Sequence, residues 1–145
     1  MSLSNKYLQQ EDTIFFEIPN DVPGYGEDYP AFPGGDNALI IYVKENTRYP
    51  QSAIKDSIEG RVILGFAIDV DGSTSDIKAL RGVRKDLDEE CIRVVKEMPK
   101  WKPGRTIKKS NKGWYWTTVK FWYSIPFTFS LSNYDNKKKI IITPR

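Results

Sequence analysis

The hydrophobic pattern is clearest over residues 61–70, where every second residue is apolar. Val62, Leu64, Phe66, Ile68 and Val70 have the two-residue period of a half-buried strand. Asp71-Gly72 follows as a hairpin turn, because Gly supplies the positive φ that such turns need. A second strand is therefore expected over about residues 74–81.

The same alternation returns in a long last strand over about residues 116–131. One side is apolar, with Val119, Phe121, Tyr123, Ile125, Phe127, Phe129 and Leu131. The other side carries Lys120, Trp122, Ser124, Pro126, Thr128 and Ser130. Because Pro126 has no backbone N–H to donate, the strand is expected at a sheet edge or at a bulge.

Helical spacing marks the segments between the strands. Asp36 is expected to cap a helix that ends near Glu45, and a short helix is expected over about residues 51–57. Asp86-Leu87-Asp88-Glu89 is typical of a capping box, followed by an apolar stripe of Leu87, Cys91, Val94, Val95 and Met98 that ends at Pro99. Residues 105–113 are basic and are expected to form a loop.

These elements predict an α+β fold, with a small three-stranded antiparallel sheet and two helices packed on one face. The last strand should lie parallel to the second, with the first between them, so that the last strand is outermost. The chain then divides into an N-terminal extension (1–30), the folded domain (31–131) and a polar, basic tail (132–145). Within that tail, residues 140–142 either add a short strand or stay loose.

Composition excludes much chemistry. The 145 residues contain 22 Lys and Arg against 19 Asp and Glu, a net charge of +3, and no His. Without His there is no Ser-His-Asp triad, no Cys-His pair and no His metal ligand. The single cysteine, Cys91, cannot form an internal disulfide. We therefore expect no enzyme, no cofactor and no metal site.

The remaining candidate motifs have simpler structural explanations. Asp69-Val70-Asp71-Gly72 has the wrong spacing for a calcium loop and fits a turn. The acidic group Asp86, Asp88, Glu89 and Glu90 fits a helix start better than acid–base catalysis, and Gly34-Gly35 fits a helix entrance better than a phosphate loop. Cys91 lies on an apolar stripe, where a core role is expected.

Basic and aromatic residues alternate over residues 100–115, a composition that suits single-stranded nucleic acid. A dedicated nucleic-acid domain is usually more basic than this nearly neutral chain. A solvated loop over a buried Trp101 is therefore the preferred interpretation, and no nucleic-acid partner is expected.

No apolar stretch approaches the ~18 residues that a membrane helix requires. Residues 2–12 are polar, so no signal-peptide core is expected after Met1. The sequence leaves open a soluble mature protein or a piece of an anchored one.

The predicted outer strand points to a binding function. An open edge has a row of unpaired N–H and C=O groups and pairs readily with another chain. Addition of an extended peptide to such an edge is a known mode of recognition. The alternative is that an extension of this chain, or a second copy, already covers the edge.

An ordered set of short motifs resembles the TonB C-terminal domain family, particularly its Bacteroidetes-type members. These motifs are Pro33-Gly34-Gly35, Tyr49-Pro50, Ile58-Glu59-Gly60-Arg61-Val62, Asp71-Gly72, Leu87-Asp88, Pro99-Lys100-Trp101-Lys102-Pro103-Gly104 and Ile125-Pro126-Phe127-Thr128-Phe129. The resemblance covers about residues 31–131. It implies a periplasmic, non-catalytic domain that pairs with the TonB box of outer-membrane receptors and supports active transport.

The resemblance also implies which residues contact the partner. They are Val119, Lys120, Phe121, Trp122, Tyr123, Ser124, Ile125 and Phe127 on the last strand, together with Tyr49 and Pro50. Partners resembling ExbB and ExbD would power transport through a tether to the inner membrane. The usual membrane helix and proline-rich linker are not in this sequence, so a sensory or scaffold domain of a larger membrane protein, its edge covered in cis or by a dimer partner, is the alternative.

Overall fold

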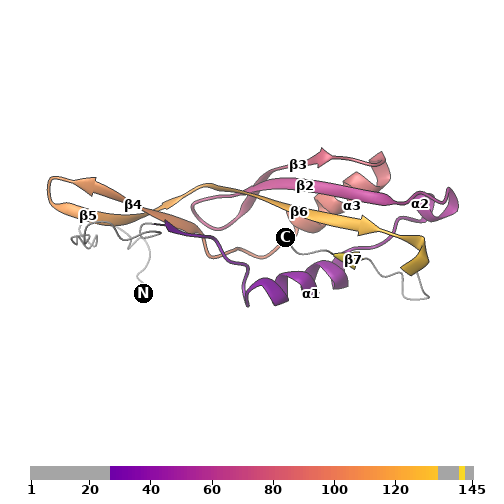
Figure 1. The fold of residues 1–145 in the computed structure, drawn as a ribbon, viewed down its shortest axis with the longest axis horizontal. Coiled ribbons are helices and arrows are strands. Elements are labelled where there is room, and N and C mark those ends of the chain that lie inside the picture. The colour runs from indigo at the N-terminus through magenta and orange to yellow at the C-terminus, as the bar shows by residue number, and fades with distance from the viewer. Residues whose placement is uncertain (1–26, 134–140, 143–145) are drawn as a thin grey trace.

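The computed structural model describes residues 27–133 and 141–142. These described residues form two antiparallel sheets and three α-helices in an elongated arrangement (Figure 1). The larger sheet has the order β3-β2-β6-β7, and the smaller one the order β1-β4-β5. The larger sheet contains β2 (Gly60–Ile68), β3 (Thr74–Arg81), β6 (Phe121–Phe129) and β7 (Ile141–Ile142). The smaller contains β1 (Glu27–Asp28), β4 (Gly104–Ser110) and β5 (Gly113–Val119).

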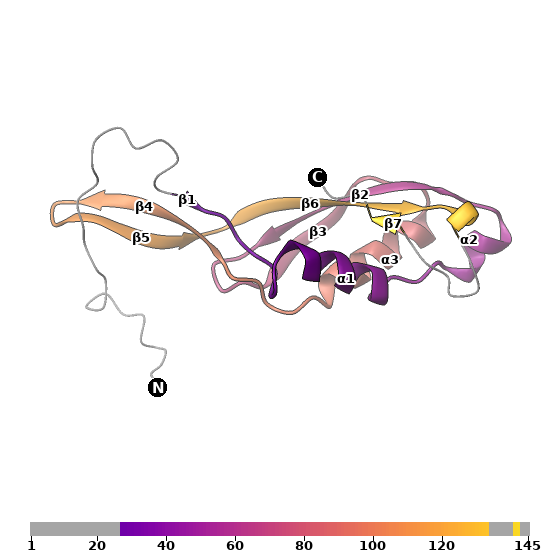
Figure 2. The same cartoon turned by 60° about the horizontal axis from the view of Figure 1, so that its bottom comes forward.

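The helices are α1 (Asp36–Asn46), α2 (Gln51–Lys55) and α3 (Lys85–Lys96), with a short 3-10 turn at Leu131–Asn133. In Figure 2, α1 and α3 lie on the same side of the larger sheet, and no helix of the described residues lies on its other face, which we call the helix-free face. The α+β class with helices on one face is therefore confirmed, although the sheet that they cover has four strands instead of three.

Strand β2 lies at the centre of the larger sheet. It pairs antiparallel with β3 on one side and, from Gly60↔Phe129 to Ile68↔Phe121, with β6 on the other. Strands β3 and β6 therefore run parallel to each other, as the sequence predicts. Gly72, with φ 90°, makes the predicted turn between β2 and β3, and its carbonyl oxygen accepts the N–H of Trp101 at 2.8 Å.

The core lies between the sheet and the helices. The even-numbered residues of β2 between Val62 and Ile68 are fully buried, and so is Phe127 of β6. Trp101, 3% exposed, packs its ring against Phe32, Phe66 and Tyr123, with centroids 5.0–5.9 Å apart. The predicted buried stripe of α3 is confirmed at Leu87, Cys91, Val94 and Val95.

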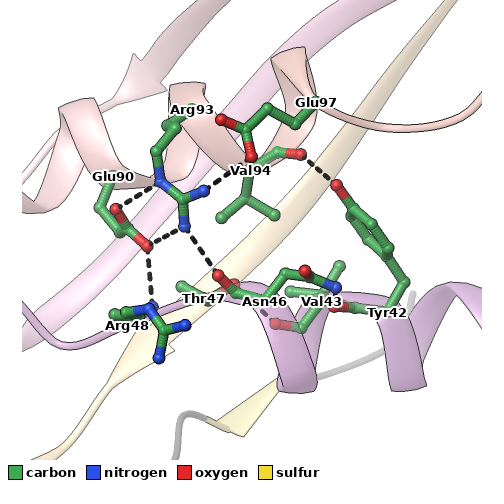
Figure 3. Close-up of polar contacts among 9 residues, drawn as sticks. All are labelled: Tyr42, Val43, Asn46, Thr47, Arg48, Glu90, Arg93, Val94 and Glu97. Carbon is green, nitrogen blue, oxygen red and sulfur yellow. Dashed lines mark hydrogen bonds and ion pairs between the residues drawn. The ribbon is translucent and has the colours of Figure 1, made fainter.

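Polar contacts join the end of α1 to α3 (Figure 3). The Tyr42 hydroxyl donates to the carbonyl oxygen of Val94 at 2.9 Å. The Arg93 guanidinium donates to the Asn46 carbonyl and to Glu90, each at 2.7 Å, and Glu90 also accepts the N–H of Arg48 at 2.8 Å. Because these bonds satisfy backbone groups at the end of α1, they fix the angle at which the chain leaves toward α2.

Two predictions about the C-terminal half were wrong. Residues 105–113, expected as a loop, form most of a β4–β5 hairpin that projects from the body of the molecule (Figure 1). The expected single strand over residues 116–131 is divided at Lys120, and its two parts lie in different sheets. On the hairpin, the Arg105 guanidinium lies 4.5 Å from the Trp116 ring centroid, and Lys109 lies 5.6 Å from that of Trp114. Such cation–π contacts stabilise a hairpin of little aliphatic content.

The predicted helix caps also need correction. Gly35, not Asp36, is the N-cap of α1, and α3 begins after Arg84 without a side-chain cap. The Asp86 carboxylate instead accepts hydrogen bonds from Arg84 at 2.7 Å and from the Ser52 hydroxyl at 2.7 Å, which ties α3 to α2. Asp88 reaches back to the N–H of Val83 at 3.0 Å. The acidic residues therefore have structural partners, as expected, but not in capping-box geometry.

The first described residues also join the smaller sheet. Residues Glu27–Asp28, assigned from sequence to the extension, form β1 and pair with β4. The rest of the predicted extension (1–26) and most of the tail (134–140 and 143–145) lie outside the described residues. Among the helices that the structure describes, no segment has the length and apolar character needed to cross a membrane.

Replacing Phe127 with Ala should lower the free energy of unfolding by ~3–5 kcal/mol, because the change leaves a cavity among fully buried side chains. Urea unfolding followed by circular dichroism measures the loss. Trp122→Ala is the control, since Trp122 is 62% exposed and its removal should change stability little. Unfolding of the Trp122 variant, with Phe127→Ala tolerated, would mean that the faces of β6 are reversed.

Acid should weaken the α2–α3 connection. The hydrogen bond from Arg84, with further bonds from Ser52 and the Leu87 N–H, holds the pKa of Asp86 well below its usual range. A lowered folded-state pKa contributes stability above the unfolded pKa of about 3.9, and this contribution is lost as the pH falls below it. We therefore expect Asp86→Asn to be less stable at pH 7 and to lose less stability than the wild type between pH 5 and pH 2.

Urea unfolding across that pH range is the measurement. Asp36→Asn is the matched control, because Asp36 is exposed in the first turn of α1 and makes no cap bond. Parallel stability curves for the wild type and Asp86→Asn would contradict the assignment.

Candidate functional site: the outer edge of β6

Strand β6 has one edge that is only partly paired. On one side it pairs with β2 along its whole length. On the other side, within the described residues, it pairs with β7 at Phe127↔Ile142 and Thr128↔Ile141. Residues 121–126 therefore have no strand beside them on that side in the part of the chain that the structure describes.

The direction of the backbone groups follows from the position of Pro126. Neighbouring residues of an antiparallel strand point their N–H and C=O groups to opposite sides. Pro126 has no N–H and lies opposite Ile63 in an unbroken register with β2, which favours the arrangement in which even-numbered residues face the open side. Trp122 and Ser124 then offer an N–H and a C=O each to a partner, whereas Pro126 is buried.

Three predicted site residues lie at this edge. Trp122 is exposed on the face without helices, and Ser124 is half-buried beside it in the sheet. Lys120, just before β6, donates to Asp76 at 2.7 Å and lies 4.0 Å from Asp69. The hydrogen bond to Asp76 raises the pKa of Lys120.

The Lys120 ammonium also lies 5.3 Å from the centroid of the Trp122 ring. The Lys120 charge is thus held across the sheet, over β3.

Other predicted contact residues turn their side chains inward. Ile125 is 5% exposed, Phe127 is fully buried, and the ring of Tyr123 packs on Phe66 and Trp101. At these positions a partner can meet little beyond the backbone. Phe127 needs a further correction, because β7 already lies beside it.

Four predicted residues lie away from the open edge or at its start. Val119 ends β5 opposite Gly104 and so belongs to the smaller sheet. Phe121 begins β6 and packs edge-on against Tyr29, 5.6 Å away. Tyr49 is 2% exposed, packs on Phe129 and donates its hydroxyl to the Ile58 carbonyl at 2.6 Å, and Pro50 is the N-cap of α2. The structure therefore makes Tyr49 a core residue, not a contact surface.

Sequence reasoning missed a hollow on the helix-free face next to this edge. It has a cavity volume of about 480 Å³ and is lined by Gly65, Lys78, Leu80, Trp122, Tyr123 and Ser124. One signal was available in the sequence, since Leu80 is an apolar residue on the outward side of its strand and is 58% exposed.

The described residues contain no group of three or more Asp, Glu, Cys or His side chains placed to hold a metal ion. Cys91 is fully buried, and burial raises the pKa of its thiol far above the ordinary value. A thiol that stays protonated is a poor nucleophile, so Cys91 acts as a core residue.

Comparison with known proteins identifies the family. The family model described as the Gram-negative bacterial TonB protein C-terminal matches residues 45–131, more than half of the chain. The chain belongs to the TonB C-terminal family. The match runs from the last turn of α1 through β6 and so contains the open edge. Domains of this family are periplasmic transport modules of Gram-negative bacteria and are not enzymes.

One solved structure is similar to this chain. It is the NMR solution structure of the Helicobacter pylori TonB C-terminal domain (residues 194–285), with 24% sequence identity and a TM-score of 0.45. The match covers 68% of this chain and 98% of that one. A search of curated proteins found no match.

Proposed function

We propose that this domain binds the TonB box of an outer-membrane receptor by adding the receptor segment as a strand to the open edge of β6. The observation that carries the proposal is the stretch of β6 over residues 121–126 without a strand neighbour among the described residues. Membership of the TonB C-terminal family supports the choice of partner.

The edge is protected against indiscriminate pairing, yet it stays open to one strand. Pro126 removes a donor, and β7 covers the far end at Phe127 and Thr128. Between these residues and Phe121, the backbone groups of Trp122 and Ser124 can form the main-chain hydrogen bonds that give strand addition its affinity. Side chains of the guest strand then supply the selectivity.

Energy transduction sets a mechanical requirement that this edge meets. A guest strand lies along β6, and β6 pairs with the buried β2 over its whole length. Tension along the guest therefore loads several hydrogen bonds together and passes into the core. In this proposal the domain works in the periplasm, tethered to the inner membrane and powered by partners resembling ExbB and ExbD.

One observation favours the alternative function. The tail of this chain supplies β7, so part of the edge is already covered in cis. A sensory or scaffold domain would use such a cover, or a second copy, to close the edge. The two functions differ in whether residues 121–126 accept a guest in the intact protein.

Peptides tiled through the N-termini of outer-membrane receptors from the same genome should shift the amide signals of Trp122 and Ser124 in the ¹⁵N-labelled chain. Trp122→Ala should weaken binding, because it removes an exposed contact surface, and should leave the melting temperature nearly unchanged. Trp114→Ala on β5 is the matched control and should bind normally. Shifts confined to β4 and β5 would contradict the proposal.

Removing residues 134–145 separates the two functions. In the full chain, β7 covers Phe127 and Thr128, so peptide-induced amide shifts should end at Ile125; in the shortened chain they should extend to Phe127 and Thr128. Binding by the shortened chain alone would favour the self-covered domain, as would a dimer in sedimentation that peptide cannot dissociate. Absence of binding by both chains would refute the proposed function.

A further inference from the structure

The helix-free face of the larger sheet has a row of residues that crosses it at one level. Gly65 on β2 lies opposite Lys78 on β3 and opposite Ser124 on β6. Gly65 has no side chain and Ser124 has a short one. The hollow described above follows this row from the open edge of β6 toward β3.

Two large apolar side chains border the hollow. Both side chains are large and apolar, yet Leu80 is 58% exposed and Trp122 is 62% exposed to water on this face of the sheet. A Cβ built on Gly65 would lie 2.8 Å from Leu80 Cδ1, so Leu80 leans over the glycine. Exposed apolar groups that gather around a concave surface are typical of a binding site.

The hollow is continuous with the edge that the proposed function uses. A strand added to β6 would extend the same row, because residues directly opposite on paired strands have Cβ atoms about 4.5–5.5 Å apart. The guest residue opposite Ser124 would direct its side chain onto the helix-free face. From there a long side chain reaches across Ser124 to Gly65, between Trp122 and Leu80.

We infer that this hollow selects the guest peptide by accepting one large apolar side chain, preferably aromatic, at the position opposite Ser124. The inference rests on the proposed function and adds a specificity-determining position to it. The indole and isobutyl groups supply apolar walls, and the alkyl stem of Lys78 lines the far end. Guest residues immediately before and after this position point to the opposite face of the sheet, so the selection acts on a single residue.

An acidic guest side chain is the main competitor for this position. Its carboxylate would meet the Lys78 ammonium at the solvent-exposed rim, where an ion pair contributes little. It would also leave the walls formed by Leu80 and Trp122 uncovered. An apolar ring covers both, and so we expect it to bind more tightly.

The test uses a receptor peptide that shifts β6, prepared with Phe, Ala or Glu at the position opposite Ser124. Contacts between the guest ring and the Leu80 methyl groups in NOE spectra identify that position. We expect the Phe peptide to bind about tenfold more tightly than the Ala or Glu peptide, as partial burial of one aromatic side chain predicts. In the Leu80→Ala variant, the Phe peptide should bind less than about threefold more tightly than the Ala peptide.

Val70→Ala is the matched control. Val70 is 54% exposed, against 58% for Leu80, but it does not line the hollow, so the preference for Phe should persist in this variant. Gly65→Ala is a second variant that fills the floor and should also reduce the preference. Melting temperatures near that of the wild type show that each variant is folded.

Each outcome has a distinct meaning. Binding at β6 with equal affinity for the Phe and Ala peptides, or a preference for Glu, would overturn this inference and leave the proposed function standing. A preference for Phe that persists in both Leu80→Ala and Gly65→Ala would also overturn it. Failure of every receptor peptide to shift β6 would refute the proposed function, and this inference with it.

Discussion

The antiparallel pairing of β2 with β6 is the constraint on which the rest of the structure depends. Strand β2 is buried by helices on one face and paired on both edges, so its register fixes where every side chain of β6 points. A shift of one residue would turn Phe127 and Phe129 out of the core and bring Trp122 into it. Within the described residues, the same pairing leaves the outer side of residues 121–126 without a strand, and this is the edge that the proposed function uses.

Protection and recognition compete along that outer edge. A long unpaired edge invites aggregation, and this molecule limits it with Pro126 and with the two-residue β7. A charged side chain at an edge strand commonly discourages pairing with another chain. The Lys120 side chain instead forms ion pairs with Asp76 and Asp69 across the helix-free face. Among the described residues, what remains open is a short stretch bordered by Trp122, which is long enough for several main-chain bonds.

The sequence predicts the parts of the fold that rest on local periodicity. Alternation gave β2, β3 and the inward face of β6, and the apolar stripe gave α3. The alternation of apolar and polar residues could not show the break at Lys120. Val119 and Phe121 continue the same alternation while the chain passes from one sheet to the other. The β4–β5 hairpin was missed because Arg105 and Lys109 are stabilised by aromatic partners on the facing strand, which local spacing does not show. The burial of Tyr49 was not foreseen because it depends on Phe129, far along the chain.

The candidate site also depends on contacts between segments that are distant in the sequence, which local periodicity does not reveal. Only the part of β6 before Phe127 was predictable as an edge, since proline restricts a strand wherever it occurs; the sheet ends at β7, not at β6 as predicted. The hollow was not, because Lys78, Gly65 and Ser124 come together only through two strand registers, one of which contains a bulge beside Gly65. Each of these residues is unremarkable alone. Their alignment places the bare backbone of Gly65 between two exposed apolar side chains and beside an open edge. The surface that we propose for binding a strand and selecting one of its side chains therefore corresponds to no motif that a single sequence would reveal.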